Sequence, residues 1–358
     1  MTMALLHRFV LLHMITVSPF RNEDFCVVHE IWTRCLPASG GRLRLFAPPL
    51  MEEMLFGSLL FDYEGLQIAW ETDTSRKKGV RPVGLVHAAS VPNRKEIEQE
   101  AVVGVLCMLL IVPDCSEPEA TRMRLLEAGE RYLFNRGIRT VYGGSIHEGV
   151  PFYCGYYGAG EPIGIFASDK ETYELFGRNG YSIKSRTTRL ELPIQNYQPK
   201  LTMKSLFWND KVKVFFEDRA KPRHWWDAQL KSRHTWIEAK AVLKNDTTRS
   251  IATTLVCIPY HDVEQVRGQP DIFHQGNIAE LIDMNVRPDF RGKGVLTHLH
   301  GKLLQEIGRR QGIVRLETQI SDEFPTLVPF LRKMGWVETD LGAIFVKKDN
   351  GAPMPVTI

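Results

Sequence analysis

The sequence lacks the patterns that mark metal sites, disulfide scaffolds and nucleic-acid binding. Its six cysteines are scattered over 358 residues, with no Cys-x-x-Cys pair and no cluster of cysteine and histidine at metal-ligand spacing. We therefore expect no zinc site and no disulfide framework, and the cysteine usage fits a reducing cytoplasm. Lysine and arginine number 45 against 42 acidic residues, a net charge of +3, without the basic excess of a nucleic-acid binder.

The opening stretch, residues 1–17, is apolar, but His7, Arg8 and His13 interrupt it. It is too short to cross a bilayer and has no small-residue cleavage site, so we expect no membrane partner. Apolar material for real cores is present, because 44% of the residues are hydrophobic and only 24% are charged. The length suggests two or three domains.

The same order of predicted elements occurs in both halves: a strand, a helix, a strand, a helix and a last strand. In the second half these are expected at 278–286, 295–311 and 313–320, in a helix ending at 333–336, and at 343–348. In the first half they are expected at 102–113, 122–137, 138–144, 171–181 and 187–192. Further strand candidates precede each series, so the sequence predicts α/β domains with mixed sheets.

The segment 192–201 holds two prolines and little periodicity, and is the best candidate for a boundary. The predicted domains are residues 1–193 and 194–358. Only the first contains an extra stretch rich in glycine and tyrosine, residues 148–164, which is too long to be a mere connection. Two interpretations stay open: this stretch lines an acceptor site, or it packs between the units. Its notable side chains are Tyr153, Tyr156, Tyr157 and Glu161.

A turn within VRPDFRGKGVLTHL (286–299) separates a predicted strand from a predicted helix. Such a turn presents unpaired backbone N–H groups at the positive end of a helix, which suits phosphate oxygens. Gly292 and Gly294 would let the backbone approach an anion without a Cβ, and Arg291 and Lys293 add positive charge. The spacing matches neither a Walker A loop nor GxGxxG. A tight turn with solvated charges is the alternative interpretation.

Together with its strand, the turn resembles motif A of the GNAT superfamily of N-acetyltransferases, a strand ending in V-x-P followed by [RQ]-x-x-G-x-[GA] and a helix. Val286-Arg287-Pro288 supplies the first element and residues 291–296 the second, with Leu296 where Gly or Ala is usual. The family's order of elements covers nearly the whole second half and, more weakly, the first. The resemblance implies two GNAT-like domains in tandem, each with a mostly antiparallel twisted sheet flanked by helices.

By this resemblance the ligand is acetyl-CoA, bound in the C-terminal domain without a metal. Its pyrophosphate would lie on the turn, and its pantetheine arm would pair with the backbone at the end of the strand. The implied cofactor-binding residues are Met284, Asn285, Val286, Arg291, Gly292, Lys293, Gly294, Val295, Leu296 and Thr297.

The corresponding turn of the first half, residues 112–120, lacks the Arg/Gln and the glycine of motif A. Asp114, Glu117 and Glu119 stand where phosphates would lie, and like charges there repel a polyphosphate. We therefore expect the N-terminal domain to be GNAT-like in structure, with a degenerate CoA loop.

Amine acetylation needs a base for the amine and a donor for the thioester carbonyl oxygen. Glu280 resembles the strand glutamate that serves as base in the histone acetyltransferase branch; the alternative is an exposed strand carboxylate. Period-two alternation would place Asp283 on the opposite side of the strand. The backbone N–H of Val286 is the donor that the family geometry implies.

The family's usual acid is a tyrosine in the late helix, and neither half has it. Leu331 and Phe176 stand at the tyrosine positions, and Phe324 replaces an accompanying asparagine. His298 and His300 are expected to be partly solvated. Trp225 and Trp226 are expected to be core residues rather than the wall of an acceptor pocket.

These features predict an acetyl-CoA-dependent N-acetyltransferase, in which a primary amine attacks directly with help from Glu280. A non-catalytic acyl-CoA-binding or sensor protein is the alternative. A third possibility is that the first unit presents the acceptor to the second. The expected partner is a small-molecule or peptide amine, and one chain is expected to be a monomer forming an internal pseudo-dimer.

Overall fold

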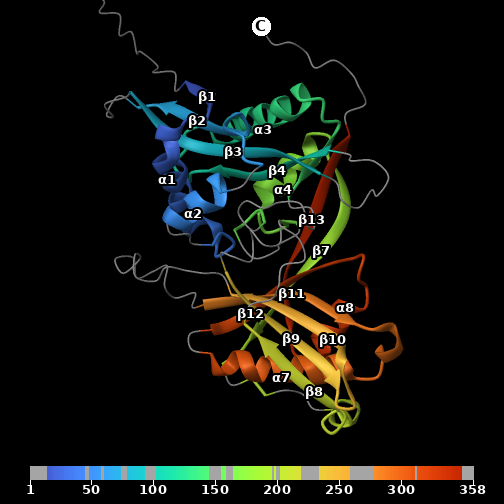
Figure 1. Ribbon diagram of the computed structural model, residues 1–358. Coiled ribbons are helices and arrows are strands. Elements are labelled where there is room, and N and C mark those ends of the chain that lie inside the picture. The colour runs from blue at the N-terminus through green and yellow to red at the C-terminus, as the bar shows by residue number, and fades with distance from the viewer. Residues whose placement is uncertain are drawn as a thin grey trace, which may run out of the picture.

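The computed structural model describes residues 14–44, 48–57, 60–73, 79–92, 102–144, 155–158, 164–195, 197–198, 202–218, 234–258, 277–310 and 313–348. Its strands form one mixed, mostly antiparallel sheet in the order β1-β2-β3-β4-β5-β13-β7-β12-β11-β10-β9-β8, with β6 beside β13. Figure 1 shows the first half of the chain above the second, with helices packed against the strands. The expected α/β architecture is confirmed.

The first half contains the strands β1 (Ile15–Pro19), β2 (Leu66–Thr72), β3 (Val80–Pro92), β4 (Val102–Ile111), β5 (Thr140–Gly143), β6 (Ile165–Phe166) and β7 (Ser182–Pro193). Its helices are α1 (Phe25–Cys35), α2 (Pro48–Phe56), α3 (Pro118–Asn135) and α4 (Lys170–Arg178), with short 3-10 turns η2 (Pro37–Ser39) and η3 (Tyr63–Gly65) among the loops. The sequence did not predict α1 and α2.

The second half contains β8 (Val212–Glu217), β9 (Thr235–Leu243), β10 (Asp246–Ile258), β11 (Asn277–Val286), β12 (Ile313–Ser321) and β13 (Val337–Lys348). Its helices are α5 (Met203–Leu206), α7 (Val295–Arg309) and α8 (Leu327–Lys333), with a 3-10 turn η5 (Pro288–Phe290) before α7. The predicted order of strands and helices is confirmed in both halves, although β13 begins earlier than expected.

The last strand of each half lies in the other half of the sheet. β7 pairs antiparallel with β12 of the second half, and β13 pairs antiparallel with β5 of the first. Between these contacts β7 and β13 pair with each other, and both run through the two halves in Figure 1. The two halves therefore share one continuous sheet.

Two hydrophobic cores follow this exchange. One core gathers side chains of the first half and also Ala343, Ile344 and Phe345 of β13. The other gathers the second half and also Leu190 and Leu192 of β7. Residues of β7 and β13 therefore contribute to both halves of the molecule. The predicted domain boundary between residues 193 and 194 stays a prediction.

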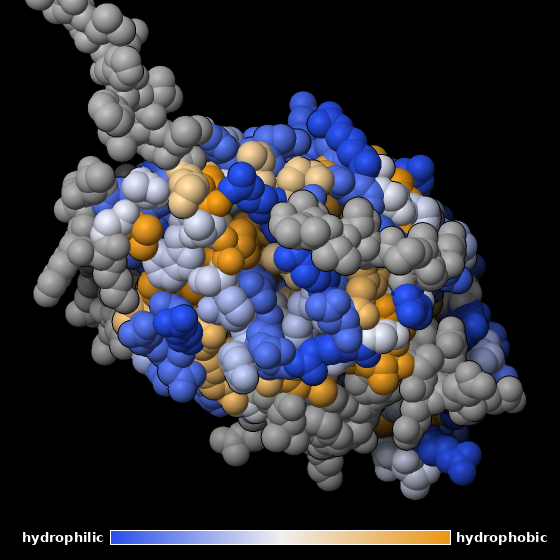
Figure 2. All heavy atoms as spheres, turned by 90° about the horizontal axis from the view of Figure 1, so that it is seen from above, coloured by the Kyte–Doolittle hydropathy of each residue, from blue (hydrophilic) through white to orange (hydrophobic). Residues whose placement is uncertain are grey.

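The surface of the described residues is mixed in character. On the face of the first half seen in Figure 2, hydrophilic and hydrophobic side chains are interspersed. None of the helices in the described ranges is both long and apolar enough to cross a membrane.

Candidate active site

In the second half, β11 and β12 pair in parallel only at their beginnings. The last paired residues are Glu280 and Glu317, after which β11 continues to Val286. We call this divergence, formed by residues 281–286 and 318–321, the second fork. Met284, Asn285 and Val286 lie on its β11 side and pair with β10 on their other edge. A fork of this kind leaves one edge of β11 available for an added extended ligand.

The turn from β11 to α7 is built on two left-handed glycines. Gly292 and Gly294 have φ values of +70° and +86°, a region that L side chains rarely adopt. A Cβ on Gly294 would also lie 2.8 Å from Cβ of Lys204 on α5. Gly294 is therefore required both by its backbone conformation and by the close approach of α5.

The turn is held from both sides by side chains. Nε of Arg291 donates to the Val286 carbonyl at 3.0 Å, and Nε1 of Trp208 donates to the Lys293 carbonyl at 2.8 Å. Gly294 is the N-cap of α7 and has no side chain to cap the helix, so the first N–H groups of α7 lack the usual cap. Arg291, Gly292 and Lys293 are exposed. The turn thus presents N–H groups and positive charge to solvent.

Glu280 stands where the fork begins, and only 6% of it is exposed. The alternative interpretation, an exposed strand carboxylate, is therefore wrong. Its Oε1 lies 3.7 Å from Nη2 of Arg44, a residue of the first half. Burial opposes the positive charge of Arg44, but Glu317 and Glu280 outweigh it, so the pKa of Arg44 is raised.

Glu317 is the centre of a buried cluster of charges. It contacts Arg44, and it accepts hydrogen bonds from Arg189 at 2.8 Å and from Arg315 at 2.9 Å. Burial alone would raise the pKa of this carboxyl, but the charges of Arg44, Arg189 and Arg315 lower it. Glu317 is therefore held ionised beside Glu280.

Asp283 lies on the same face of β11 as Glu280, contrary to the expectation from simple alternation. Leu255 opposes Asp283 and Val256 opposes Leu281, so Ile282 is an extra residue in the strand. Such a β-bulge shifts the alternation of side chains by one position. Because Cys257 opposes Glu280, and Leu255 and Cys257 point to one face, Glu280 and Asp283 share that face.

An apolar cluster borders Glu280 on this face. It consists of Trp236, Leu255 and Cys257, with Ile282 packed against it. Cys257 is fully buried and lies directly opposite Glu280 in the ladder. The surroundings of Glu280 are thus apolar on the β10 side and charged on the β12 side.

His298 and His300 of α7 are buried, so the expectation of partly solvated histidines is wrong. Burial, and then the charge of Lys302, lower the pKa of His298. Burial lowers the pKa of His300 to about 4, and its Nε2 accepts a hydrogen bond from Nε1 of Trp336 at 3.0 Å. The two rings are about 200° apart around α7: His298 lies beside Ser205 of α5, and His300 lies against Trp336 and Phe330, so helical spacing alone did not show that both are buried.

The positions of the family's acid are apolar and buried. Leu331 on α8 and Phe176 on α4 are both fully buried, and Phe324 is exposed. None of these side chains can donate a proton. Trp225, Trp226, Tyr153 and Glu161 lie outside the described residues.

The first half has an equivalent fork, which contains the chain's own side chains. β4 and β5 pair in parallel as far as Leu106 and Gly143, and β4 then continues to Ile111. The hydroxyl of Tyr156 donates to the Leu109 carbonyl on this continuation at 3.0 Å. Tyr157 stacks on Phe166 of β6, with ring centroids 4.6 Å apart. Tyr156 and Tyr157 are both buried, and Tyr156 is bound to the β4 side of the first fork.

The acidic turn of the first half is tied into ion pairs. Asp114 accepts hydrogen bonds from Arg34 at 2.5 Å and from Arg81 at 2.6 Å. Partial burial works against the charge, but these two arginines hold the pKa of Asp114 below its ordinary value. The arginines beside this turn are therefore already used by a carboxylate of the protein.

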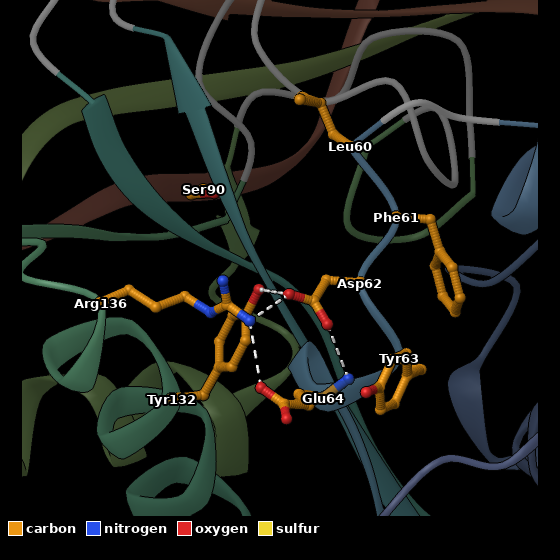
Figure 3. Close-up of a pocket in the computed structure, with 8 residues that line it drawn as sticks. All are labelled: Leu60, Phe61, Asp62, Tyr63, Glu64, Ser90, Tyr132 and Arg136. Atoms are coloured by element: carbon orange, nitrogen blue, oxygen red, sulfur yellow. Dashed lines mark hydrogen bonds and ion pairs between the residues drawn. The ribbon is translucent and has the colours of Figure 1, made fainter.

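A separate cavity of about 490 Å³ lies beside η3 and the end of α3 (Figure 3). Its polar side chains bind one another: Arg136 contacts Asp62 and lies 3.1 Å from Glu64, and Tyr132 donates to Asp62 at 3.1 Å. These groups satisfy each other, so we assign this cavity no role. In the part of the chain that the structure describes, no group of three or more His, Cys, Asp or Glu residues could hold a metal ion.

Comparison with known proteins gives two results for the sequence. A model of the acetyltransferase (GNAT) family matches residues 201–336, which include the glycine turn and the second fork. None of the curated proteins matches the sequence.

Several solved structures are similar over most of the chain. A fungal multi-domain GH3 beta-N-acetylglucosaminidase with a GCN5-related glucosamine N-acetyltransferase region gives a TM-score of 0.63 at 15% identity; the match covers 94% of this chain and 38% of that one. A tandem GNAT protein from the clavulanic acid biosynthesis pathway gives 0.62 at 12% identity, with coverages of 95% and 100%. A GCN5-related N-acetyltransferase from Sphaerobacter thermophilus gives 0.56 at 14% identity, with coverages of 93% and 95%. The chain thus spans little more than a third of the fungal protein, and these likenesses show the fold.

Proposed function

We propose that the protein is an acetyl-CoA-dependent N-acetyltransferase whose C-terminal domain, residues 194–358, binds the cofactor, because residues 201–336 match the model of the acetyltransferase (GNAT) family and the whole chain has the tandem GNAT fold. The observation that carries the proposal is the glycine turn beside the second fork. Its left-handed glycines, exposed charges and uncapped helix start fit a pyrophosphate.

The residues of the turn and those of the strand would bind different parts of the cofactor. Arg291, Gly292, Lys293, Gly294, Val295, Leu296 and Thr297 would hold the pyrophosphate, and Met284, Asn285 and Val286 would pair with the pantetheine arm through their backbone. Bound acetyl-CoA supplies the acyl thioester. Leu296, the departure from the family pattern, is half-buried beside the exposed residues of the turn. Its position is compatible with a ligand on the N–H side of the turn.

Transfer then needs one proton to leave the amine. The amine nitrogen attacks the thioester carbonyl carbon, the carbon–sulfur bond breaks, and Glu280 takes the amine proton directly or through a water molecule. The N–H of Val286 would polarise the carbonyl oxygen. Because Leu331 and Phe176 have no hydroxyl, we assign protonation of the leaving thiolate to water.

The acceptor is proposed to be a small-molecule or peptide amine, without nucleic acid or membrane as partner. The apolar cluster Trp236, Leu255 and Cys257 beside Glu280 suits an acceptor with an apolar part. One sheet shared by both halves supports an internal pseudo-dimer that works as a monomer. The cysteine usage supports a cytoplasmic location.

A second candidate function is a non-catalytic acyl-CoA-binding or sensor protein. The buried Leu331 at the acid position favours it. Release of free thiol from acetyl-CoA, measured against a panel that includes glucosamine, lysine and a peptide amino terminus, separates the two. Thiol release with an amine supports the transferase, whereas CoA binding without thiol release supports the sensor.

The phosphate cradle is tested by calorimetric titration of CoA into Gly294→Asp. We expect the affinity to fall at least tenfold, because the new carboxylate repels phosphate and its Cβ meets Lys204. Gly177→Asp, the same change at an exposed glycine of α4 with open space around it, is the matched control. If Gly294→Asp does not fold, Lys293→Glu reverses a charge on the exposed turn. Unchanged affinity in a folded turn variant would remove the cradle from the proposal.

A further inference from the structure

Arg44 belongs to the first half of the chain but ends in the charge cluster of the second. It lies in the loop between η2 and α2, where its N–H donates to the Tyr157 carbonyl at 3.0 Å. Its own carbonyl accepts a hydrogen bond from Nε1 of Trp32 at 2.7 Å. The first half therefore fixes the backbone of Arg44 on both sides, and only 3% of the residue is exposed.

The guanidinium of Arg44 lies between two carboxylates that face each other across the ladder. Glu280 and Glu317 are register partners on β11 and β12, so their side chains share one face of the sheet. Nη2 of Arg44 contacts Glu317 and lies 3.7 Å from Oε1 of Glu280. Two neighbouring carboxylates disfavour each other's ionised forms, whereas a cation between them favours both.

The two carboxylates depend on Arg44 to different degrees. Glu317 keeps its contacts with Arg189 and Arg315 when Arg44 is removed, and it stays ionised. Glu280 then loses its contact with the guanidinium and keeps a negative neighbour. Removal of Arg44 therefore favours the protonated, catalytically inactive form of Glu280.

The other described groups around Glu280 are carboxylates, which favour its protonated form, a buried thiol, and two arginines that partly neutralise those carboxylates. Asp283 shares its face of β11, Glu191 lies opposite Glu317 on β7, and Cys257 on β10 is a buried thiol. Negative charges on β11, β12 and β7 favour protonation of Glu280. Arg189 and Arg315 neutralise Glu317 and Glu191, with Arg315 lying 2.8 Å from Glu317.

The position of Arg44 is costly for stability alone. Its Nε and Nη1 are buried and have no hydrogen-bond acceptor among the described residues. Buried donors without an acceptor destabilise a fold, and such groups in native proteins call for an explanation. Charged groups with strongly perturbed surroundings are concentrated at functional sites, and Arg44 lies beside the candidate base.

We propose that Arg44 is a positioning residue of the transfer reaction: the first half supplies the cation that keeps Glu280 ionised and oriented, so the active site of the second half is incomplete without it. This inference rests on the proposed function, with Glu280 as the base. It gives the first half a chemical role in the reaction although its own turn lacks the motif.

The test is the pH dependence of kcat/KM in the full chain, measured as thiol release from acetyl-CoA with the most active amine of the panel. We expect Arg44→Gln to move the acidic limb to higher pH by about one unit or more, and to change the rate at high pH much less. Arg44→Lys should move the limb by less, because it keeps the charge. Arg315→Gln, which removes a cation from Glu317 without touching Glu280, should shift it less than Arg44→Gln.

A second variant tests the same idea with the opposite sign. Glu317→Gln removes the negative neighbour of Glu280 and should move the acidic limb to lower pH. This variant keeps the proposal testable even if Arg44→Gln does not fold. An Arg44→Gln profile that is unchanged, or lowered by the same factor at every pH, would overturn the proposal. If Glu280→Gln keeps the wild-type profile, or if no amine and no pH gives turnover, the proposed function itself fails.

Discussion

The two forks differ in what the chain places inside them. In the first half the fork starts at Leu106, and Tyr156 bonds to the strand beyond it. In the second half it starts at Glu280, six residues before Val286, just as Leu106 stands six before Val112. The same strand–helix–strand arrangement thus has buried tyrosines at the fork of the first half, which we call the packed junction. At the fork of the second half it has the cluster of Glu280, Glu317 and Arg44, which we call the charged junction. A few side chains at equivalent places separate a structural unit from a candidate enzyme unit.

The turns that follow the forks differ in the same sense. The first turn carries Asp114, which is bound by Arg34 and Arg81. The second has two left-handed glycines and exposed cations. Both turns lead into helices of similar place and length, so the helix start alone does not make the site. The left-handed glycines and the exposed positive charges distinguish the second turn.

The largest expected effect comes from the charged junction. Glu280→Gln should lower kcat/KM by about 10²- to 10⁴-fold at neutral pH, because the amine loses its base, while CoA affinity stays within about twofold. Glu127→Gln, an exposed glutamate of α3, is the control that keeps the wild-type rate. Steady-state kinetics and calorimetry measure both quantities. A fully active Glu280→Gln enzyme would erase the functional difference between the forks.

Substitutions of Tyr156 in the packed junction should lower the stability of the fold and leave CoA binding unchanged. Tyr156→Ala removes a buried aromatic side chain and should cost about 3–5 kcal/mol of unfolding free energy. Tyr156→Phe loses only the hydrogen bond to Leu109 and should cost about 1 kcal/mol. Urea unfolding gives these values, and calorimetry should still find one CoA per chain. If Tyr156→Ala is as stable as the wild type, the tyrosine does not fill the first fork.

Each half also buries a histidine that stays neutral, and this gives the smallest expected effect. Burial lowers the pKa of His300 to about 4 and that of His87 to about 3, from an ordinary 6.5. Below pH 6.5 the unfolded chain binds protons that the folded chain refuses, so stability falls as the pH is lowered to about 4. His300→Gln should make the slope shallower by about 1.4 kcal/mol per pH unit. An unchanged slope would mean that His300 is protonated in the fold.

Local patterns in the sequence were enough to predict most strands and helices, and the glycine turn. Helical spacing reports which apolar residues are buried within one helix, and those of α3 and α7 follow it; β4 is predicted from its continuous apolar run, since it is buried along most of its length. The exchange of β7 and β13 is different, because a local pattern does not say which half of the sheet a strand pairs with. Only the long-range pairing decides between them.

A contiguous motif is enough to predict the candidate cofactor turn, whereas the proposed role of Arg44 depends on a residue that is distant in the sequence. The turn at 291–296 is contiguous, so its spacing could be read directly. Arg44 is a single arginine in a loop, and no local pattern connects it to Glu280. The bulge at Ile282 reversed the face predicted for Asp283, because the sequence does not show where a strand contains an extra residue. The burial of His298 and His300 likewise depends on the elements that pack against α7.

The most direct measurement is a crystal structure of the full chain with CoA. We expect one CoA per chain, with its pyrophosphate on the N–H groups of residues 291–297 and its pantetheine arm along residues 284–286, and with Tyr156 still bound in the first fork. CoA bound in the first fork, or bound away from the glycine turn, would contradict this expectation.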